Sequence, residues 1–373
     1  METINLQGVL AHFLDRDQPL SPRQWQVCSH IQACRTAALG GLKRHCDHCD
    51  YEVPQYHACR DRHCPQCQWR ASRRWCEQQQ AAVLPVTYYH LVFTLPHTLN
   101  RWVQLHPEVI YRLLFHSVWN TLKRFAINAR RFGGELGMTA VLHTWGQNLS
   151  RHVHLHCLIP GGTLNPDGQW RQARGDYLFP VRALSRAFRG KLVSALRAAA
   201  QHGELHRITR PGDIDNTLAE LMQTEWVVYS KPCVSHTKSV VAYLARYSHR
   251  IAISDQRLLG VEDDQVVFRY KDYRDHDAQK VMRLSGAEFI RRFLLHVLPK
   301  GLMRLRHYGF LANCCRAKKL TRIRVALEQD GESTESHVAH DTTNTLEGYP
   351  CPKCHQGTMR VIALLPPARR TGY

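Results

Sequence analysis

The stretch RHVHLHCLIP, residues 151–160, alternates histidine with apolar residues. Because successive side chains of a β-strand point to opposite faces, His152, His154 and His156 would share one face. The apolar residues between them would face a core. The pattern therefore predicts a strand with one buried face and one face lined by imidazoles, which are common ligands of divalent metals.

Strands and helices are also predicted on both sides of this stretch. Runs rich in β-branched and aromatic residues predict strands at 86–96, 138–147, 225–231 and 265–273. Helical spacing with Pro or Gly at the ends predicts helices at 107–131, 183–203 and 286–299. We expect strands 86–96 and 153–160 to be neighbours at the centre of an antiparallel or mixed sheet, because neither shows a clean polar alternation. The polar segment 328–350 is predicted to be a linker or a disordered loop.

The cysteines are unevenly distributed, which predicts a cysteine-rich head, a large central domain and a C-terminal appendage. The overall class is α+β, with predicted regions at 1–80, 81–280 and 281–373. The chain carries 50 Lys and Arg against 31 Asp and Glu, a formal charge of +19, which favours a polyanionic partner such as nucleic acid. Arginines cluster at 60–75 and 291–310.

Membrane and secretory classes are disfavoured. No apolar run approaches the ~20 residues that a bilayer span requires. The N-terminal residues 1–17 include acidic side chains and lack the basic-then-apolar pattern of a signal peptide. We therefore expect a cytoplasmic protein, in which the 14 cysteines are metal ligands or free thiols rather than disulfide partners.

Two Cys-x₂-Cys pairs lie close together in the head, CDHC at 46–49 and CPQC at 64–67. Each pair can occupy two corners of a tetrahedral Zn²⁺ site, and the loop between them returns the chain for the second pair. We predict a structural zinc, because four thiolates leave no open position for catalysis. The predicted ligands are Cys46, Cys49, Cys64 and Cys67.

The other cysteines leave alternatives open. Cys28, Cys34, Cys59 and His63 could complete a second site, could replace one of the chosen ligands, or could be small buried residues. Near the C-terminus, CPKC at 351–354 is half of another zinc ribbon. The candidate ligands of this second zinc are Cys351, Cys354, Cys314, Cys315 and His355.

Arginine and tryptophan surround the predicted head site. Arg60, Arg62 and Arg70 suit contacts with phosphates, and neighbouring tryptophans suit stacking on bases. Alternatively, the tryptophans pack the small core of the ribbon.

A tyrosine pair supplies a candidate nucleophile for the imidazole row. In SVVAYLARYSHRIAIS, residues 239–254, Tyr243 and Tyr247 would share one face of a helix, with Arg246 and Arg250 nearby. A tyrosine phenolate can attack a phosphodiester and form a covalent phosphotyrosine. A divalent cation held by the imidazoles would polarise that phosphate and orient it for attack.

These motifs together resemble the two-tyrosine HUH transposases of rolling-circle insertion sequences, and the resemblance covers nearly the whole chain. The shared stretches are ACRTAALGG (33–41), CRDRHCPQCQ (59–68), YHLVFTLPHTL (89–99), LHTWGQNLSRHVHLHCLIPGG (142–162), YLARYSHRIAIS (243–254), YGFLANCCRAKKL (308–320) and CPKC. The resemblance implies a central HUH nuclease domain with an antiparallel sheet flanked by helices. It also implies His154 and His156 as ligands of a catalytic Mg²⁺ or Mn²⁺, and Tyr243 and Tyr247 as nucleophiles. The superfamily usually adds a third ligand, for which Gln147 is the first choice and His152 the alternative.

The resemblance further implies a bacterial, nucleoid-associated enzyme acting on single-stranded DNA. It would nick the DNA at the element's end, form a 5′-phosphotyrosyl link and transfer the strand to a target, with the zinc head recognising the terminal DNA. Arg246 and Arg250 would hold phosphates, as would Lys231 or Lys238, and His249 could accept a tyrosine proton.

Three other functions remain alternatives. A rolling-circle replication initiator or relaxase would use the same chemistry, but the cysteine-rich head argues against it. A zinc-ribbon DNA-binding regulator would need no catalysis, and its tyrosine pair would be core. A zinc hydrolase would need a carboxylate base beside the histidines, and residues 138–165 contain none.

Overall fold

The computed structural model describes residues 4–15, 17–70, 72, 82–128, 132–173, 178–233, 251–273, 275–329 and 348–368. The chain forms two compact units, each assembled from segments distant in sequence. The first unit comprises the described residues of Met1–Ala71, Ile251–Val297 and Ser336–Tyr373, and the second those of Ser72–Arg250 and Leu298–Glu335. The predicted C-terminal region, 281–373, is thus divided between the two units, and both units mix α and β structure.

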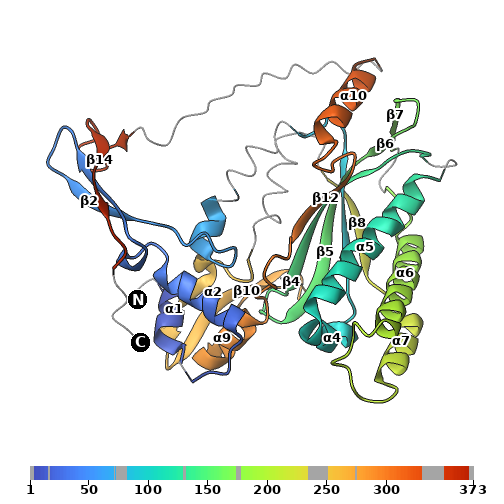
Figure 1. Ribbon diagram of the computed structural model, residues 1–373, viewed down its shortest axis with the longest axis horizontal. Helices are drawn as coiled ribbons and strands as arrows, with labels where there is room; N and C mark the ends of the chain where they lie inside the picture. Colours follow the sequence, from blue (N-terminus) through green and yellow to red (C-terminus); the bar gives the residue numbers. More distant parts are fainter. Residues whose placement is uncertain are drawn as a thin grey trace. The chain divides into compact units, whose positions relative to one another are not determined.

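The second unit is built on a five-stranded antiparallel sheet in the order β12-β4-β5-β3-β8 (Figure 1). The prediction that segments 86–96 and 153–160 are central neighbours is confirmed, because β3 and β5 pair along their length, with Tyr89 opposite Ile159. The strands are β3 (Tyr88–Thr94), β4 (Gly137–Trp145), β5 (Arg151–Pro160), β8 (Val228–Cys233) and β12 (Leu305–Gly309).

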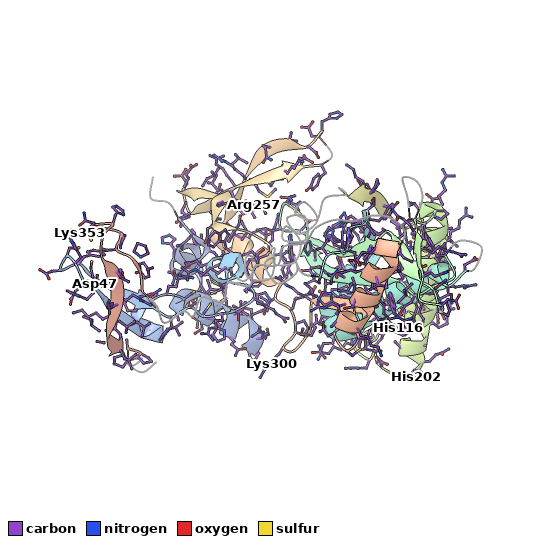
Figure 2. All side chains as sticks on the ribbon, turned by 90° about the horizontal axis from the view of Figure 1, so that it is seen from above. Asp47, His116, His202, Arg257, Lys300 and Lys353 are labelled. Carbon is purple, nitrogen blue, oxygen red and sulfur yellow. The ribbon has the colours of Figure 1, made fainter. Side chains whose placement is uncertain are left out.

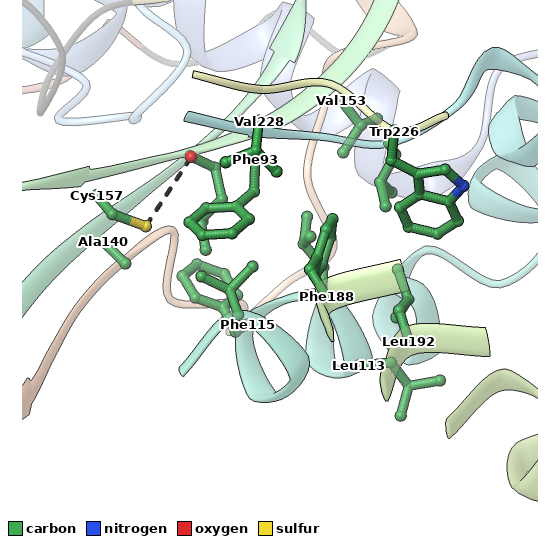
Figure 3. Close-up of a cluster of buried hydrophobic side chains, with 14 of the residues drawn as sticks. Phe93, Leu113, Phe115, Ala140, Val153, Cys157, Phe188, Leu192, Trp226 and Val228 are labelled. Atoms are coloured by element: carbon green, nitrogen blue, oxygen red, sulfur yellow. Dashed lines mark hydrogen bonds between the residues drawn. The ribbon is translucent and has the colours of Figure 1, made fainter. Parts of the chain in front are cut away.

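Helices cover one face of this sheet and enclose the main core. They are α4 (Asn100–Leu105), α5 (Pro107–Ala126), α6 (Val181–Gln201) and α7 (Asp213–Gln223). The core includes Val153 and Cys157 of β5, as the alternation of the RHVHLHCLIP stretch predicts. Figure 3 shows both side chains beside Phe93, which meets Phe188 of α6 edge-on with ring centroids 5.1 Å apart.

One end of the opposite face is covered by a smaller core. Helix α10 (Arg316–Gln329) packs there through Leu320 and Ile323 against Tyr88 and Leu158 of the sheet. The hairpin β6 (Gly162–Leu164) and β7 (Trp170–Gln172) borders it. The remaining part of this face carries the histidines of β5.

The first unit contains two smaller sheets. One has the order β13-β14-β1-β2, and Figure 1 shows the C-terminal strand β14 alongside the N-terminal hairpin. The other has the order β11-β10-β9. The strands are β1 (Gly41–Cys46), β2 (Glu52–Tyr56), β9 (Leu258–Glu262), β10 (Gln265–Asp272), β11 (Ala278–Ser285), β13 (Tyr349–Pro350) and β14 (Thr358–Leu365).

Among the described residues, the first unit also contains the helices α1 (Leu6–Phe13), α2 (Pro22–Ala33) and α9 (Gly286–Leu294), and residues 65–70 are helical. Helices α1 and α9 meet at Gly286, where a Cβ atom would lie 2.1 Å from the ring of Phe13. Short 3₁₀ turns occur at Ala37–Leu39, Asp255–Arg257 and, in the second unit, His97–Leu99. Within the part of the chain described, no helix is both long enough and apolar enough to cross a bilayer.

Candidate metal centres

Three imidazoles meet on the face of the five-stranded sheet that the main core does not occupy. His154 and His156 extend from β5, and His143 extends from β4, where it lies directly opposite His154. One ring nitrogen of each lies within 4.8 Å of the others. Adjacent antiparallel strands thus bring together donors that could bind one cation from the same side. We call these three residues the histidine cluster.

The contacts at Nδ1 of His154 and His156 indicate which nitrogen of each ring would bind a metal. Nδ1–H of His154 donates to the carbonyl oxygen of His152 at 2.8 Å, so the lone pair of that ring is on Nε2. Nδ1 of His156 lies 2.8 Å from Nε2 of His90 on β3. Burial lowers the pKa of His90 to about 4, so His90 is neutral at physiological pH and can accept this hydrogen bond. With His90 as the acceptor, Nε2 would be the ligating nitrogen of His156 as well.

His143 was not among the predicted ligands. It is a single histidine within the predicted strand 138–147, and only the register of β4 against β5 places it opposite His154. Its ring is 3 % exposed and stacks on Trp145, with ring centroids 4.6 Å apart. The stacking and burial leave this imidazole little rotamer freedom, which suits a metal ligand.

Gln147 and His152, the two candidates for the third metal ligand, lie in different elements of the fold. Gln147 lies in the turn after β4, and its role stays a prediction. His152 extends from β5, and its ring lies 4.9 Å from that of His154 and 5.6 Å from that of His97. Burial, with the neighbouring His97, lowers the pKa of His152. Its backbone carbonyl orients His154, and its ring does not belong to the histidine cluster.

The predicted nucleophiles Tyr243 and Tyr247 lie outside the described residues, as do Arg246, Arg250, Lys238 and His249. Strand β8, which directly precedes this segment in sequence, is an edge strand of the sheet that carries the histidine cluster. Lys231 of β8 is the register partner of His90 and is therefore on the face of the histidines.

A first cluster of four sulfurs lies in the head, formed by Cys34, Cys59, Cys64 and Cys67. The Sγ atom of Cys67 lies 3.6 Å from those of Cys34 and Cys59, and the Sγ atoms of Cys34 and Cys64 are also 3.6 Å apart. Tetrahedral Zn²⁺ with Zn–S bonds of ~2.3 Å separates its sulfurs by about 3.8 Å. The donor set and its spacing therefore fit a structural zinc. We call this the first cysteine cluster.

A second cluster of four sulfurs is formed by Cys46, Cys49, Cys351 and Cys354, which differs from the predicted grouping. The Sγ atoms of Cys46 and Cys354 are 3.7 Å apart, and those of Cys49 and Cys351 are 3.8 Å apart. The single site with Cys46, Cys49, Cys64 and Cys67 is wrong for a physical reason. The Cys-x₂-Cys spacing determines how one pair binds, but the β1–β14 pairing decides which pairs meet. We call this set the second cysteine cluster.

The predicted partnership of Cys351 and Cys354 with Cys314 and Cys315 is also wrong. Cys314 is exposed, and the thiol of Cys315 contacts the carbonyl oxygen of Gly309 at 3.6 Å. Both residues follow β12 in the second unit, whereas the CPKC motif belongs to the first.

The basic side chains of the head differ in exposure. Arg60 and Arg70 are exposed, and Trp69 is 60 % exposed, so this tryptophan does not pack a core. Arg62 is half-buried, and burial together with Arg23 lowers its pKa. The DNA contacts of these arginines stay a prediction.

His63, an alternative zinc ligand, is bound to a carboxylate instead. Its Nδ1 lies 2.8 Å from Asp61, whose other oxygen is 3.0 Å from Nδ1 of His30. This network, in which Asp61 and His63 are buried, links α2 to the loop that supplies Cys59 and Cys64. His63 therefore supports the first cysteine cluster without joining it.

Comparisons with known proteins identify a zinc-binding domain and a transposase family. The family described as "Transposase zinc-binding domain" matches residues 5–95, and the family described as "Putative transposase" matches residues 137–319. The chain is similar to the "Putative transposase y4qJ" of Sinorhizobium fredii strain NGR234, at 43% identity over 359 residues, 92% of this chain and 90% of that one. It is also similar to the transposase for insertion sequence element IS801 of Pseudomonas savastanoi pv. phaseolicola, at 26% identity over 336 residues, 85% of this chain and 77% of that one.

Proposed function

The chain belongs to the transposase family and carries an N-terminal transposase zinc-binding domain, and on this premise we propose that it cleaves and rejoins single-stranded DNA at the ends of an insertion sequence. The observation that carries the proposal is the histidine cluster on an antiparallel sheet. The second unit would then be an HUH nuclease domain, and the cysteine clusters would belong to the part that recognises the terminal DNA.

The covalent step uses a tyrosine of the segment 239–254. The phenolate oxygen of Tyr243 or Tyr247 attacks the scissile phosphorus and forms a tyrosine–5′-phosphate bond. The bond from phosphorus to the 3′ oxygen breaks, and the leaving strand departs as a 3′-hydroxyl after protonation. A 3′-hydroxyl can later attack the phosphotyrosine, which restores a phosphodiester without ATP. The second tyrosine permits a second strand transfer.

The histidine cluster would hold the divalent cation, with Nε2 of His154 and His156 directed by their Nδ1 hydrogen bonds. Three imidazoles favour Mn²⁺ over Mg²⁺, because Mg²⁺ prefers oxygen ligands. When bound, this cation polarises the scissile phosphate. His90 acts as a positioning residue, because its buried ring keeps that of His156 in one tautomer.

Charge supports a DNA substrate. The chain carries a net +19, and Lys231 is exposed on the face of the histidine cluster. Arg60, Arg70 and the exposed Trp69 provide phosphate contacts and a stacking surface in the head. A protein with this substrate would act in the bacterial cytoplasm, in association with the nucleoid.

The hydrolase alternative receives less support. Such an enzyme needs a general base, and among the residues that the structure describes the histidine cluster includes no carboxylate. The comparisons favour a transposase over a replication initiator with the same chemistry.

The test is adduct formation with an end-labelled single-stranded oligonucleotide that contains the element terminus, in the presence of Mn²⁺. We expect a covalent protein–DNA adduct in the wild type. Replacing both Tyr243 and Tyr247 by Phe, or His143 by Ala, should abolish it, whereas the exposed control Tyr273→Phe should retain it. Cleavage that persists in the double tyrosine variant would support a hydrolase, and binding without cleavage by the wild type would support a regulator.

A further inference from the structure

Two Cys-x₂-Cys turns face each other in the second cysteine cluster, and both orient their sulfurs with backbone amides. The amides of His48 and Lys353 lie 3.4 Å from the sulfurs of Cys46 and Cys351, respectively. The amide of Gly357 lies 3.4 Å from the sulfur of Cys354. Amide donors stabilise thiolates, which are the form of cysteine that binds metal.

The spacing of the sulfurs fits Zn²⁺ and does not fit a disulfide. The two cross-turn distances are 3.7 and 3.8 Å, against about 3.8 Å for a tetrahedral Zn²⁺ site and ~2.05 Å for a disulfide. Cys46 and Cys351 are fully buried, and Met359 packs against them. Four inward sulfurs without any metal would be a poor core, because a thiol packs only as a small hydrophobe.

We propose that the second cysteine cluster binds a Zn²⁺ of its own, and that this ion fastens the C-terminal segment 348–368 to strand β1. The matched zinc-binding region, residues 5–95, contains all four ligands of the first cysteine cluster. It contains only Cys46 and Cys49 of the second, so this centre depends on two ligands from the far end of the chain. The proposal is independent of the DNA chemistry.

The segment buries little apolar surface of its own. Val361, Ile362 and Leu364 of β14 are 44 %, 50 % and 78 % exposed, so the strand buries little apolar surface. Besides its ladder with β1, the segment is bound through Asp47, which accepts hydrogen bonds from the amide of Thr358 at 2.7 Å and from Nε of Arg360 at 3.0 Å. Arg44 of β1 also donates from Nη1 to the carbonyl oxygen of Met359 at 3.0 Å and lies over the ring of Tyr349. Figure 2 shows Asp47 and Lys353 at the same end of this sheet. So small a core needs a metal or a similar cross-link.

Gly357 provides a way to disturb the centre without removing a ligand. A Cβ atom at this position would lie 2.5 Å from the sulfur of Cys46 and 2.6 Å from Cβ of His48. Because the amide of Gly357 also donates to Cys354, an added methyl group would force the two turns apart.

The experiment measures zinc per chain by mass spectrometry of purified full-length protein, together with amide hydrogen exchange of residues 358–365. We expect two cysteine-bound zinc ions in the wild type and one in Cys351→Ser/Cys354→Ser, with any zinc at the histidine cluster counted separately as the ion lost from His143→Ala. We expect reduced occupancy in Gly357→Ala and two ions in the exposed-thiol control Cys314→Ser. Amides of β14 should exchange at least tenfold faster in the double variant, while amides of α2, next to the first cysteine cluster, stay protected.

Two results would overturn the proposal. One is a wild type that holds a single zinc, with Cys351→Ser/Cys354→Ser retaining it. The other is loss of the second zinc from Gly357→Ala or from the double variant without faster exchange in β14, which would leave the ion no fastening role. If the double variant loses the protection of α2 as well, Gly357→Ala decides between these outcomes.

Discussion

Replacing His90 by Phe should weaken divalent-cation binding by 10- to 100-fold, although His90 is not a ligand. The substitution keeps a ring in the site but removes the nitrogen that lies 2.8 Å from Nδ1 of His156. The lost hydrogen bond is worth about 0.5–1.5 kcal/mol, and an unsatisfied N–H in a buried place costs about 1–3 kcal/mol. Removing an outer partner of a metal-bound histidine typically costs 10- to 100-fold in affinity, or about 1.4–2.8 kcal/mol.

The assay is a Mn²⁺ titration of the full-length protein without DNA, followed by the electron paramagnetic resonance of free Mn²⁺ at pH 7.5. His90→Gln should recover part of the loss, because its amide can still bond to Nδ1 of His156. His307→Phe is the matched control, since His307 is another histidine on the same face of this sheet but bonds to Thr139.

The positioning role of His90 is refuted if His90→Phe binds Mn²⁺ within twofold of the wild type while His154→Ala does not bind it. A loss in His307→Phe equal to that in His90→Phe would also refute it, because the effect would then come from general disturbance of the sheet.

Four further predictions concern stability and can be checked by urea unfolding. Phe93 is fully buried in the main core, so Phe93→Ala should lose about 3–5 kcal/mol, and a loss below about 1 kcal/mol would contradict the packing described. Gly309 has φ +61°, and a Cβ there would lie 1.7 Å from the carbonyl oxygen of Leu136, so Gly309→Ala should lose at least about 2 kcal/mol. Gly190 lies in α6, and a Cβ atom there would have no atom within 4 Å, so Gly190→Ala should raise the free energy of unfolding by about 0.5–1 kcal/mol. Equal effects of the two glycine substitutions would contradict these surroundings. Burial, with Arg316, lowers the pKa of His307 to about 4. The unfolded chain therefore takes up the proton first, and stability that is fully present above pH 6.5 falls by about 3 kcal/mol towards pH 4. His307→Gln should show a shallower fall, and parallel curves would argue against this assignment.

Local patterns in the sequence predict the elements of the second unit well. The strand predicted at 86–96 is Tyr88–Thr94, and the helix predicted at 183–203 is Val181–Gln201. Long apolar periodicity carries this information. Strand β14 lacks such a signal, because its apolar residues remain exposed and its partner β1 is more than 300 residues away.

The metal-site candidate His143, the third member of the histidine cluster, likewise cannot be recognised from local sequence alone. His154 and His156 are recognisable because they alternate within one strand. His143 becomes a candidate only when the register of β4 against β5 is known. A shift of one residue would turn it into the main core, so its position depends on long-range packing of both strands.

The cysteine pairing shows why closeness in sequence is a weak guide to a metal site. Fourteen residues separate Cys49 from Cys64, and the partner that Cys49 meets instead, Cys351, is 302 positions away. Each doubling of a loop costs only about 0.6 kcal/mol in closure entropy, so the longer closure costs about 2.5 kcal/mol more. Structural zinc binding contributes about 10–16 kcal/mol, and either pairing would gain it. The extra closure cost of about 2.5 kcal/mol is outweighed by the ladder between β1 and β14 and by the hydrogen bonds of Asp47. The order of cysteines along the chain therefore indicates that zinc binds, while the strand pairing decides which pairs share an ion.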